Sequence, residues 1–146
     1  MNLPAIATTT TGSFPRPGWL AETNRTAVDF QLEGDVLREA QDDATALILQ
    51  EQEEMGFDLV TDGEQRRVSF ITHIIAGMEG FEFTKTHLKA IRRRTVANRE
   101  VPSVVGPITR RGPIVVDDLK FAKARTRLPV KMAVPGPMTV IDSSFD

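Results

Sequence analysis

Two short polar segments carry residue types that could bind a charged small molecule. Gly12 and Ser13 follow a β-branched stretch, and Glu64 closes the segment Asp62-Gly63-Glu64 after a short apolar stretch. A loop N–H and a hydroxyl are good donors for an anion, and a fixed carboxylate forms charge-assisted hydrogen bonds with a cation. By local chemistry alone, the first segment also fits a strand-ending turn, and the second fits a solvated loop.

A basic run in the middle of the chain is the main local asymmetry of charge. Its members are Lys85, Lys89, Arg92, Arg93, Arg94, Arg99, Arg110 and Arg111. The run predicts either a solvated hairpin face or the attraction of an anionic substrate such as a polyglutamyl tail, a phosphate or a sulfonate. Nucleic acid is not expected as a partner, because the overall charge is nearly balanced and the basic residues lack aromatic interleaving.

The composition is that of an ordinary globular chain. Its 146 residues include 18 Lys and Arg against 20 Asp and Glu, a formal net charge of −2, and 40% are hydrophobic. The length suits one domain with its own core. Cys is absent, which excludes disulfides, Cys-ligated metal and a Cys nucleophile within this chain, and fits a cytoplasmic location. No apolar stretch reaches the roughly 18 residues of a membrane span, and residues 1–4 lack the pattern of a signal peptide.

Strand-like and helix-like stretches alternate along the chain. Apolar or β-branched runs predict strands at residues 5–11, 57–60 and 129–134. Helical periodicity predicts helices at residues 35–55, 68–78 and 115–125, and residues 19–33 are read as helix plus loop. Residues 82–112 are strand-like and punctuated by Pro and Gly, which predicts a hairpin excursion.

The helix over residues 35–55 has the clearest pattern. Its apolar or small stripe is Val36, Ala40, Ala44, Leu47, Ile48 and Met55. Asp35 is expected as its N-cap and Gly56 as its stop. Alternating elements of this kind predict a parallel sheet with outer helices, and sites in such folds gather at the C-terminal ends of the strands.

The order of several motifs resembles the catalytic barrel of the cobalamin-independent methionine synthases. The matching stretches are residues 8–15, residues 52–58 with Asp62-Gly63-Glu64, then Gly80-Phe81, then Arg99 with Pro102 and Gly106, and finally residues 134–139. They follow one another from the N-terminus almost to the last residue. A single short match would carry little weight, whereas the ordered set is specific to this superfamily.

The resemblance implies an α/β fold, namely the first half of a (β/α)8 TIM-type barrel with a β-hairpin excursion. Residues 1–146 would be the N-terminal portion of that single barrel domain. The implied reaction is zinc-dependent methyl transfer from a 5-methyltetrahydrofolate polyglutamate to the thiol of homocysteine, which gives methionine.

Two alternatives remain open beside that reaction. Relatives with a segment like residues 62–67 include alkyl transferases that act on other thiols, such as coenzyme M. In addition, methionine synthases of the family carry a Trp near the pterin where this chain has Ser143. The other alternative is a catalytically inactive binding module that uses the anion-attracting basic face.

The family's functional residues carry over at four positions. Gly12 and Ser13 match positions that hold the carboxylate of the amino-acid substrate. Glu64 matches the carboxylate that pairs with the substrate ammonium. Arg99 matches a basic residue on the folate side, where a guanidinium could pair with a glutamate tail or stack on a ring.

The metal and the assembly follow from the same resemblance. The family's zinc ligands, a His, a Glu and two Cys, lie in the second half of the barrel. Zinc is therefore expected for the complete barrel and not on this chain alone, and no catalytic or metal-ligating residue is assigned here. Because a half barrel leaves two open sheet edges, self-association or a complementing C-terminal half is expected.

Overall fold

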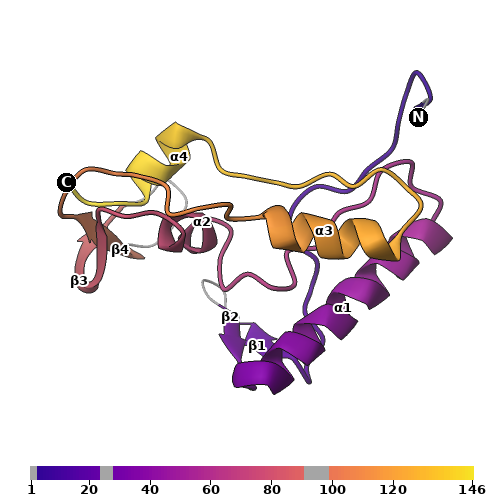
Figure 1. Ribbon diagram of the computed structural model, residues 1–146, viewed down its shortest axis with the longest axis horizontal. Coiled ribbons are helices and arrows are strands. Elements are labelled where there is room, and N and C mark those ends of the chain that lie inside the picture. The colour runs from indigo at the N-terminus through magenta and orange to yellow at the C-terminus, as the bar shows by residue number, and fades with distance from the viewer. Residues whose placement is uncertain (1–2, 24–27, 91–98) are drawn as a thin grey trace. The chain divides into compact units, whose positions relative to one another are not determined.

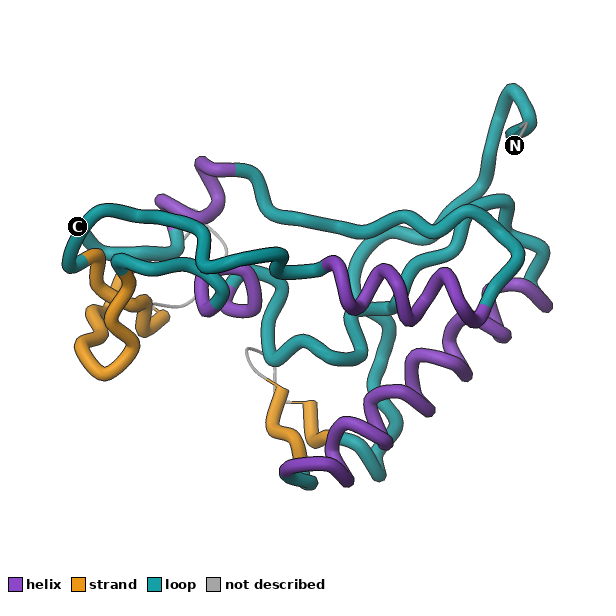
Figure 2. Tube along the Cα trace, viewed as in Figure 1, coloured by secondary structure: helices purple, strands orange, loops and turns teal. Residues whose placement is uncertain are grey.

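The chain is described by a computed structural model that covers residues 3–23, 28–90 and 99–146, and it divides into two compact units. The first unit comprises Met1–Phe70 and Val115–Ala133, and the second comprises Ile71–Ile114 and Val134–Asp146. Helices and short strands are joined by long loops in both units (Figures 1 and 2). The fold is mixed α/β, as the sequence predicts.

Helix α1, Gly34–Glu54, dominates the first unit and confirms the helix predicted over residues 35–55. The predicted N-cap is wrong, because Glu33 occupies the cap position and Asp35 lies in the first turn. The Glu33 side chain makes no capping hydrogen bond. The negative charge of Asp35 instead stabilises the helix start through the helix dipole.

The end of α1 is a Schellman motif, which confirms Gly56 as the stop. The Phe57 N–H donates to the Gln52 carbonyl at 3.2 Å, and the Gly56 N–H donates to the Glu53 carbonyl at 3.0 Å. Gly56 has φ +78°, which glycine adopts without the strain that a Cβ would bring. The sharp reversal sends the chain directly into the next extended segment.

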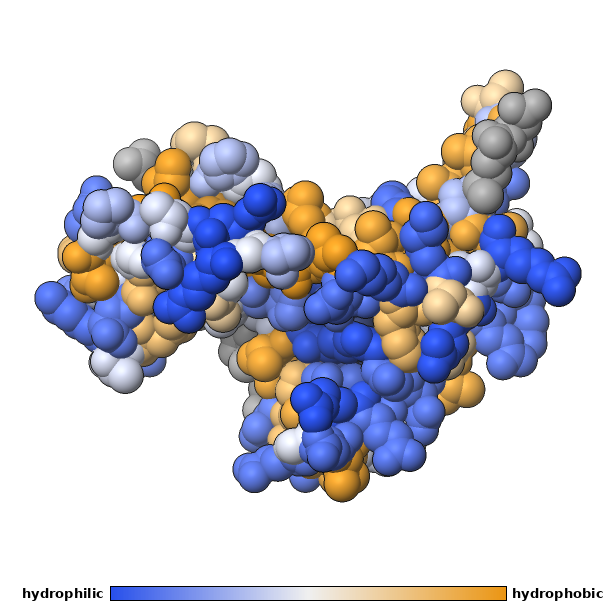
Figure 3. Space-filling model, in the orientation of Figure 1, coloured by the Kyte–Doolittle hydropathy of each residue, from blue (hydrophilic) through white to orange (hydrophobic). Residues whose placement is uncertain are grey.

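Only part of the predicted apolar stripe of α1 is buried. Ala40, Ala44 and Ile48 are buried, whereas Val36, Leu47 and Met55 are more than half exposed. Two polar side chains, Thr45 and Gln52, share the buried face. The outer surface over α1 is mainly hydrophilic in the view of Figure 3, as is typical of a helix with one buried face.

Two short strands pack against the N-terminal half of α1. Strand β1, Ala21–Thr23, pairs antiparallel with β2, Val28–Phe30. The helix-plus-loop prediction for residues 19–33 is therefore wrong. Leu20 and Ala21 are fully or almost fully buried against α1, and this burial holds the strand pair in place.

The three predicted strands of the first unit lie side by side, but each is reduced to a minimal bridge. Parallel bridges join Thr9 to Leu59 and Val60 to Val130, so residues 57–60 occupy the middle. The parallel pairing is as predicted, whereas the predicted strand lengths are wrong. Each bridge is closed by backbone hydrogen bonds, including Lys131 N–H to the Val60 carbonyl at 2.8 Å.

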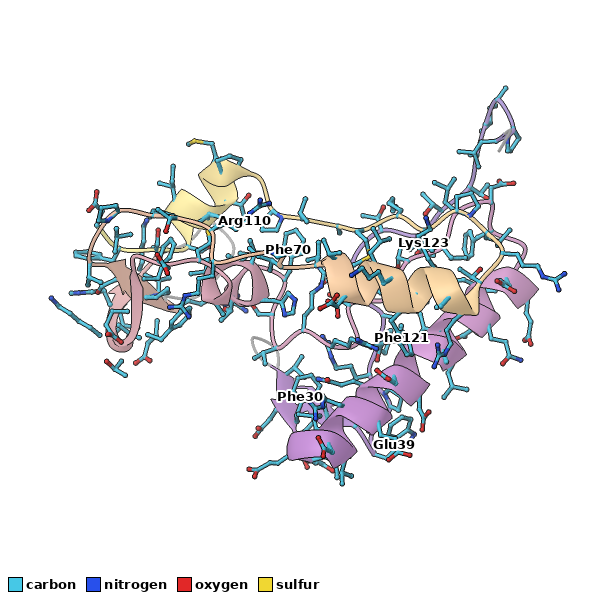
Figure 4. The ribbon with its side chains drawn as sticks, in the orientation of Figure 1. Phe30, Glu39, Phe70, Arg110, Phe121 and Lys123 are labelled. Atoms are coloured by element: carbon cyan, nitrogen blue, oxygen red, sulfur yellow. The ribbon has the colours of Figure 1, made fainter. Side chains whose placement is uncertain are left out.

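Helix α3, Val116–Arg125, confirms the helix predicted over residues 115–125 and packs beside α1 (Figure 1). Ala122 is fully buried with Leu49 and Val60. Phe121 lies on the side of α3 that faces α1, whereas Lys123 lies on the other side (Figure 4). The guanidinium carbons of Arg66 and Arg125 lie 4.1 and 4.0 Å from the centre of the Phe121 ring.

The second unit contains a longer antiparallel pair. Strand β3, Phe81–Lys89, pairs with β4, Arg99–Val104, with a register shift between Glu82 and Thr86. Gly80 precedes β3 with φ +86°, and a Cβ there would lie 2.6 Å from the Pro107 carbonyl oxygen. Glycine is therefore needed for this close approach.

The helices of the second unit are short. Helix α2 spans Thr72–Ala76, so the helix predicted over residues 68–78 is too long by several residues. Helix α4, Pro137–Asp142, lies in a segment for which no helix is predicted. Lys89 donates to the carbonyls of Ile141 and Ser144 at the end of α4, which suits a cation at a helix C-terminus. Within the described ranges, no helix is long and apolar enough to cross a membrane.

Candidate functional site

A small cavity opens at the ends of the three parallel segments of the first unit, where the sequence places its polar clusters. Its volume is about 60 Å³. Its wall is formed by residues 10–12, Thr61, Asp62, Glu64, Lys131 and Ala133. A space of this size holds a few water molecules or the charged end of a small ligand.

Ser13 and Glu64 meet beside this cavity, although they are 51 residues apart in sequence. The Ser13 hydroxyl donates to Glu64 Oε2 at 2.7 Å. Glu64 is 5% exposed and lines the cavity together with Gly12. Three of the four predicted site residues are thus brought together, and a carboxylate so fixed can accept from a cationic ligand.

The backbone of Glu64 is held in an unusual conformation. Its φ is +57°, in the left-handed region that side-chain-bearing residues seldom adopt. The Glu64 N–H donates to Asp62 Oδ1 at 3.1 Å. The Glu64 carbonyl accepts from Arg16 Nη2 at 2.7 Å and from the Arg67 N–H at 3.1 Å. These contacts over-determine the conformation, which aims the carboxylate at the cavity.

Beneath Glu64 lies a buried ion pair. Arg67 is fully buried, and its Nη2 lies 3.4 Å from Asp62 Oδ2. Arg67 Nη1 also donates to the Ala133 carbonyl at 2.8 Å. Burial raises the pKa of Asp62, and the nearby Arg67 charge opposes that rise. Burial also lowers the pKa of Arg16, against the attraction of Glu64 and Asp62.

The side chain of Gln52 connects α1 to two of the segment ends. Its Nε2 donates to the carbonyls of Ile48 and Thr61 at 2.9 and 2.8 Å. Its Oε1 accepts from the Thr61 N–H at 3.0 Å and from the Thr10 hydroxyl at 3.2 Å. A fully buried amide is thereby satisfied on both sides, which fixes the cavity wall to the helix.

Gly63 allows the site segment to lie close to α1. Its φ is +61°, and a Cβ at this position would lie 2.8 Å from Ile48 Cγ2 and 3.3 Å from the Phe14 Cβ. The Phe14 N–H donates to the Gly63 carbonyl at 3.0 Å, so the Gly12–Ser13 loop is tied to the same residue. A side chain here would separate the two segments that carry the site.

Lys131 is the one cation among the described residues that form the cavity wall. It is half-buried, and its Nζ donates to the Thr10 carbonyl oxygen at 2.6 Å. Its backbone is fixed beside Val60 by the parallel bridge at Val130. The cavity therefore presents a carboxylate and an ammonium on the same wall.

Arg99, the fourth predicted site residue, is in the other unit, at the start of β4. It is partly buried, and it lies opposite Lys89 in the antiparallel pair of β3 and β4. Of the basic run, Arg92, Arg93 and Arg94 lie outside the described residues. The structure thus groups the amino-acid-binding candidates in one unit and assigns Arg99 to the other.

Sequence reasoning missed four charged residues that build the site: Arg16, Asp62, Arg67 and Lys131. Asp62 and Arg67 flank Glu64 in one segment, and an acid five residues before a base at a strand end was an available signal of a buried pair. Lys131 is a charged residue inside an otherwise apolar predicted strand. Such a residue is costly to bury, and its presence there indicated a polar site.

The described residues do not fit a zinc ion. No group of three or more His, Asp or Glu side chains comes together among residues 3–23, 28–90 and 99–146, and the chain has no Cys. A zinc site needs three or four such ligands around one point. What this part of the chain offers is a charged binding cavity rather than a metal centre.

Comparison with known proteins gives a consistent match over nearly the whole chain. The family model described as the catalytic domain of cobalamin-independent synthase matches residues 6–146. The chain is 34% identical over 145 residues to a methionine synthase of Saccharolobus solfataricus. It is 32% identical over 149 residues to a 5-methyltetrahydropteroyltriglutamate–homocysteine methyltransferase of Streptococcus sanguinis.

A solved structure shares the fold. A B12-independent methionine synthase from Shewanella sp. W3-18-1, in complex with selenomethionine, superposes with a TM-score of 0.88 and 42% sequence identity over 96% of this chain. The chain is much shorter than these relatives. It spans 42% of the Saccharolobus protein, 19% of the Streptococcus protein and 40% of the Shewanella chain.

Proposed function

The chain belongs to the family of cobalamin-independent synthase catalytic domains, and we propose that it forms the amino-acid-binding portion of a methyltransferase that converts homocysteine to methionine. Gly12, Ser13 and Glu64 would bind the amino acid. The methyl donor would be a 5-methyltetrahydrofolate polyglutamate, and Arg99 would pair with its anionic tail.

The observation that carries this proposal is the buried carboxylate of Glu64 on the wall of a cavity of about 60 Å³. A carboxylate that is held in place by Ser13 and is shielded from water pairs strongly with an ammonium group. The Shewanella relative holds selenomethionine, and an amino acid of the same class has the ammonium that Glu64 requires.

The same carboxylate argues against coenzyme M as the acceptor. Coenzyme M carries a sulfonate, which Lys131 could accept, but it has no ammonium and would leave the buried charge of Glu64 without a cation. A buried charge without a partner weakens binding. An amino-acid thiol such as homocysteine therefore fits the cavity better.

In this proposal the chain is the first half of a (β/α)8 barrel and works with further protein. Among the described residues, the segment around Val130 forms its bridge on the Val60 side, and the segment around Thr9 forms its bridge on the Leu59 side. Both outer edges are available for pairing with more strands. The zinc expected of the complete barrel would take its ligands from that further part, and the role of this chain is to bind and orient the acceptor.

Calorimetric titration tests the proposal directly. We expect the chain to bind L-homocysteine and L-methionine and to bind coenzyme M more weakly. Glu64→Gln keeps the shape of the side chain and removes its charge, and it should weaken binding of both amino acids by about tenfold or more. Glu39→Gln on the exposed face of α1 is the matched control and should leave affinity unchanged. Equal affinity in the Glu64 variant would exclude this cavity as the amino-acid site.

A further inference from the structure

Three charged side chains line the cavity, namely Asp62, Glu64 and Lys131. Asp62 is paired with the buried Arg67, and the proposed function uses only the charge of Glu64. The Nζ of Lys131 lies 2.6 Å from the Thr10 carbonyl oxygen. We propose that Lys131 binds the carboxylate of the amino-acid ligand, so that the cavity recognises a zwitterion by both of its charges. This inference rests on the proposed function and adds a specificity-determining residue to it.

The contacts of Lys131 leave its ammonium able to take a ligand. An ammonium group has three hydrogens to donate, and the contact with Thr10 uses one of them. The Lys131 N–H donates to the Val60 carbonyl at 2.8 Å, so the backbone beneath the side chain is fixed. The carbonyl contact holds the cation at the wall without neutralising its charge.

The contacts of Ser13 make a second donor necessary. A serine hydroxyl has one hydrogen, and in this structure Ser13 donates it to Glu64. The hydroxyl therefore cannot hold Glu64 and donate to a ligand carboxylate at the same time. Lys131 supplies a full positive charge, and hydrogen bonds between charged groups are about twice as strong as neutral ones.

The size of the cavity favours one ligand that spans both charges. The amino and carboxylate groups of an α-amino acid are attached to the same carbon atom, so they can reach two neighbouring points of a small wall. A volume of about 60 Å³ suits this charged end, with the side chain directed outward. A simple amine would satisfy Glu64 alone, and a simple carboxylate would satisfy Lys131 alone.

The test uses three probes that share one methylthio side chain, titrated calorimetrically into the 146-residue chain. L-Methionine has both charged groups, 3-(methylthio)propylamine lacks the carboxylate, and 4-(methylthio)butanoate lacks the amine. Lys131→Gln should weaken binding of L-methionine by about tenfold or more and leave the affinity for the amine unchanged. Lys131→Arg keeps the charge and should retain most of the affinity for L-methionine.

Glu64→Gln should give the reciprocal result. It should weaken binding of the amine and leave the affinity for the butanoate unchanged. Thermal unfolding checks that each variant is folded, and Lys131→Met, which keeps the length of the side chain, replaces Lys131→Gln if that variant does not fold. If Lys131→Gln weakens binding of L-methionine and of the amine equally, or changes neither affinity, the inference is wrong while the proposed function stands. If the unaltered chain binds none of the three probes, the proposed function fails, and this inference fails with it.

Discussion

The guanidinium of Arg67 and the carboxylate of Asp62 form an ion pair within 3.4 Å that is almost completely shielded from solvent. The other oxygen of Asp62 accepts the N–H of Glu64. The charge pair is therefore connected by one hydrogen bond to the backbone of the residue that faces the cavity. Asp62 therefore contributes both to the buried ion pair and to the position of Glu64 at the cavity.

Removing the side chain of Asp62 should destabilise the fold. Asp62→Ala leaves the Glu64 N–H without its acceptor and the fully buried Arg67 without its carboxylate partner. Breaking a buried pair by removing one partner costs about 3–5 kcal/mol, and urea unfolding at neutral pH measures the loss. Asp35→Ala is the control, because Asp35 and its partner Arg38 are both largely exposed and should contribute little. Equal stability of the Asp62 variant and the unaltered chain would contradict the buried pair.

The pH dependence of stability should carry opposite contributions from two aspartates. Burial raises the pKa of Asp62, so the folded chain holds that proton more tightly than the unfolded chain. The contribution of Asp62 is therefore favourable at low pH and declines as pH rises from the ordinary Asp value, about 3.9, through the raised pKa. Relative to Asp62→Asn, the unaltered chain should lose stability as pH increases across this window.

Asp58 should behave in the opposite way. Hydrogen bonds from the Thr8 backbone N–H and hydroxyl lower the pKa of Asp58. Its contribution is present above the ordinary Asp value and is lost as pH falls through the lowered pKa. Relative to Asp58→Asn, the unaltered chain should lose stability on acidification. Chemical unfolding at several pH values measures both differences, and slopes of the same sign would contradict this assignment.

A side chain at Gly63 should disturb both the fold and the site. Gly63→Ala combines φ +61° with a Cβ 2.8 Å from Ile48, so we expect a loss of about 1–3 kcal/mol in unfolding free energy. The same change should weaken amino-acid binding, since Glu64 follows directly. Gly18→Ala is the matched control, because its Cβ would meet nothing within 4 Å and its φ is not positive. Equal effects of the two changes would show that the close approach at Gly63 is unimportant.

The chain should also associate, because among the described residues the segments around Thr9 and Val130 each form a parallel bridge on one side only. Size-exclusion chromatography with light scattering should show dimers or larger species whose proportion rises with concentration. Adding the remaining part of a homologous barrel as a separate chain should replace that self-association by a one-to-one complex. A monomer at high concentration that also ignores the added part would contradict the open-edge interpretation.

The parts of the fold that were predictable are those with a local signal. The helix at residues 35–55 has a long periodic pattern and a glycine stop, and the structure confirms both. The strands at 5–11, 57–60 and 129–134 were placed correctly and made too long, because a run of β-branched residues shows a preference and not the number of partners. The β1–β2 pair was missed because its stability comes from burying Leu20 against α1, a contact between distant residues.

The residues of the candidate site also separate into those that the sequence predicted and those that it did not. Ser13 and Glu64 were found through motif order, and their contact is in the structure. Arg67 was overlooked, because a charged side chain in a loop is usually solvated and its burial depends on Asp62 and on the distant Ala133 carbonyl. Arg99 was grouped with the other residues by resemblance alone, and its place in the second unit could not be read from local sequence.

The four hydrogen bonds of Gln52 restrict which insertions and deletions the chain can accept during evolution. One residue inserted or deleted within α1 would turn this amide by about 100° around the helix axis and detach it from Thr10 and Thr61. The helix therefore cannot accept a change in length between this amide and the buried residues Ala40 and Ala44. Related sequences should keep a constant spacing between these two positions and the glutamine.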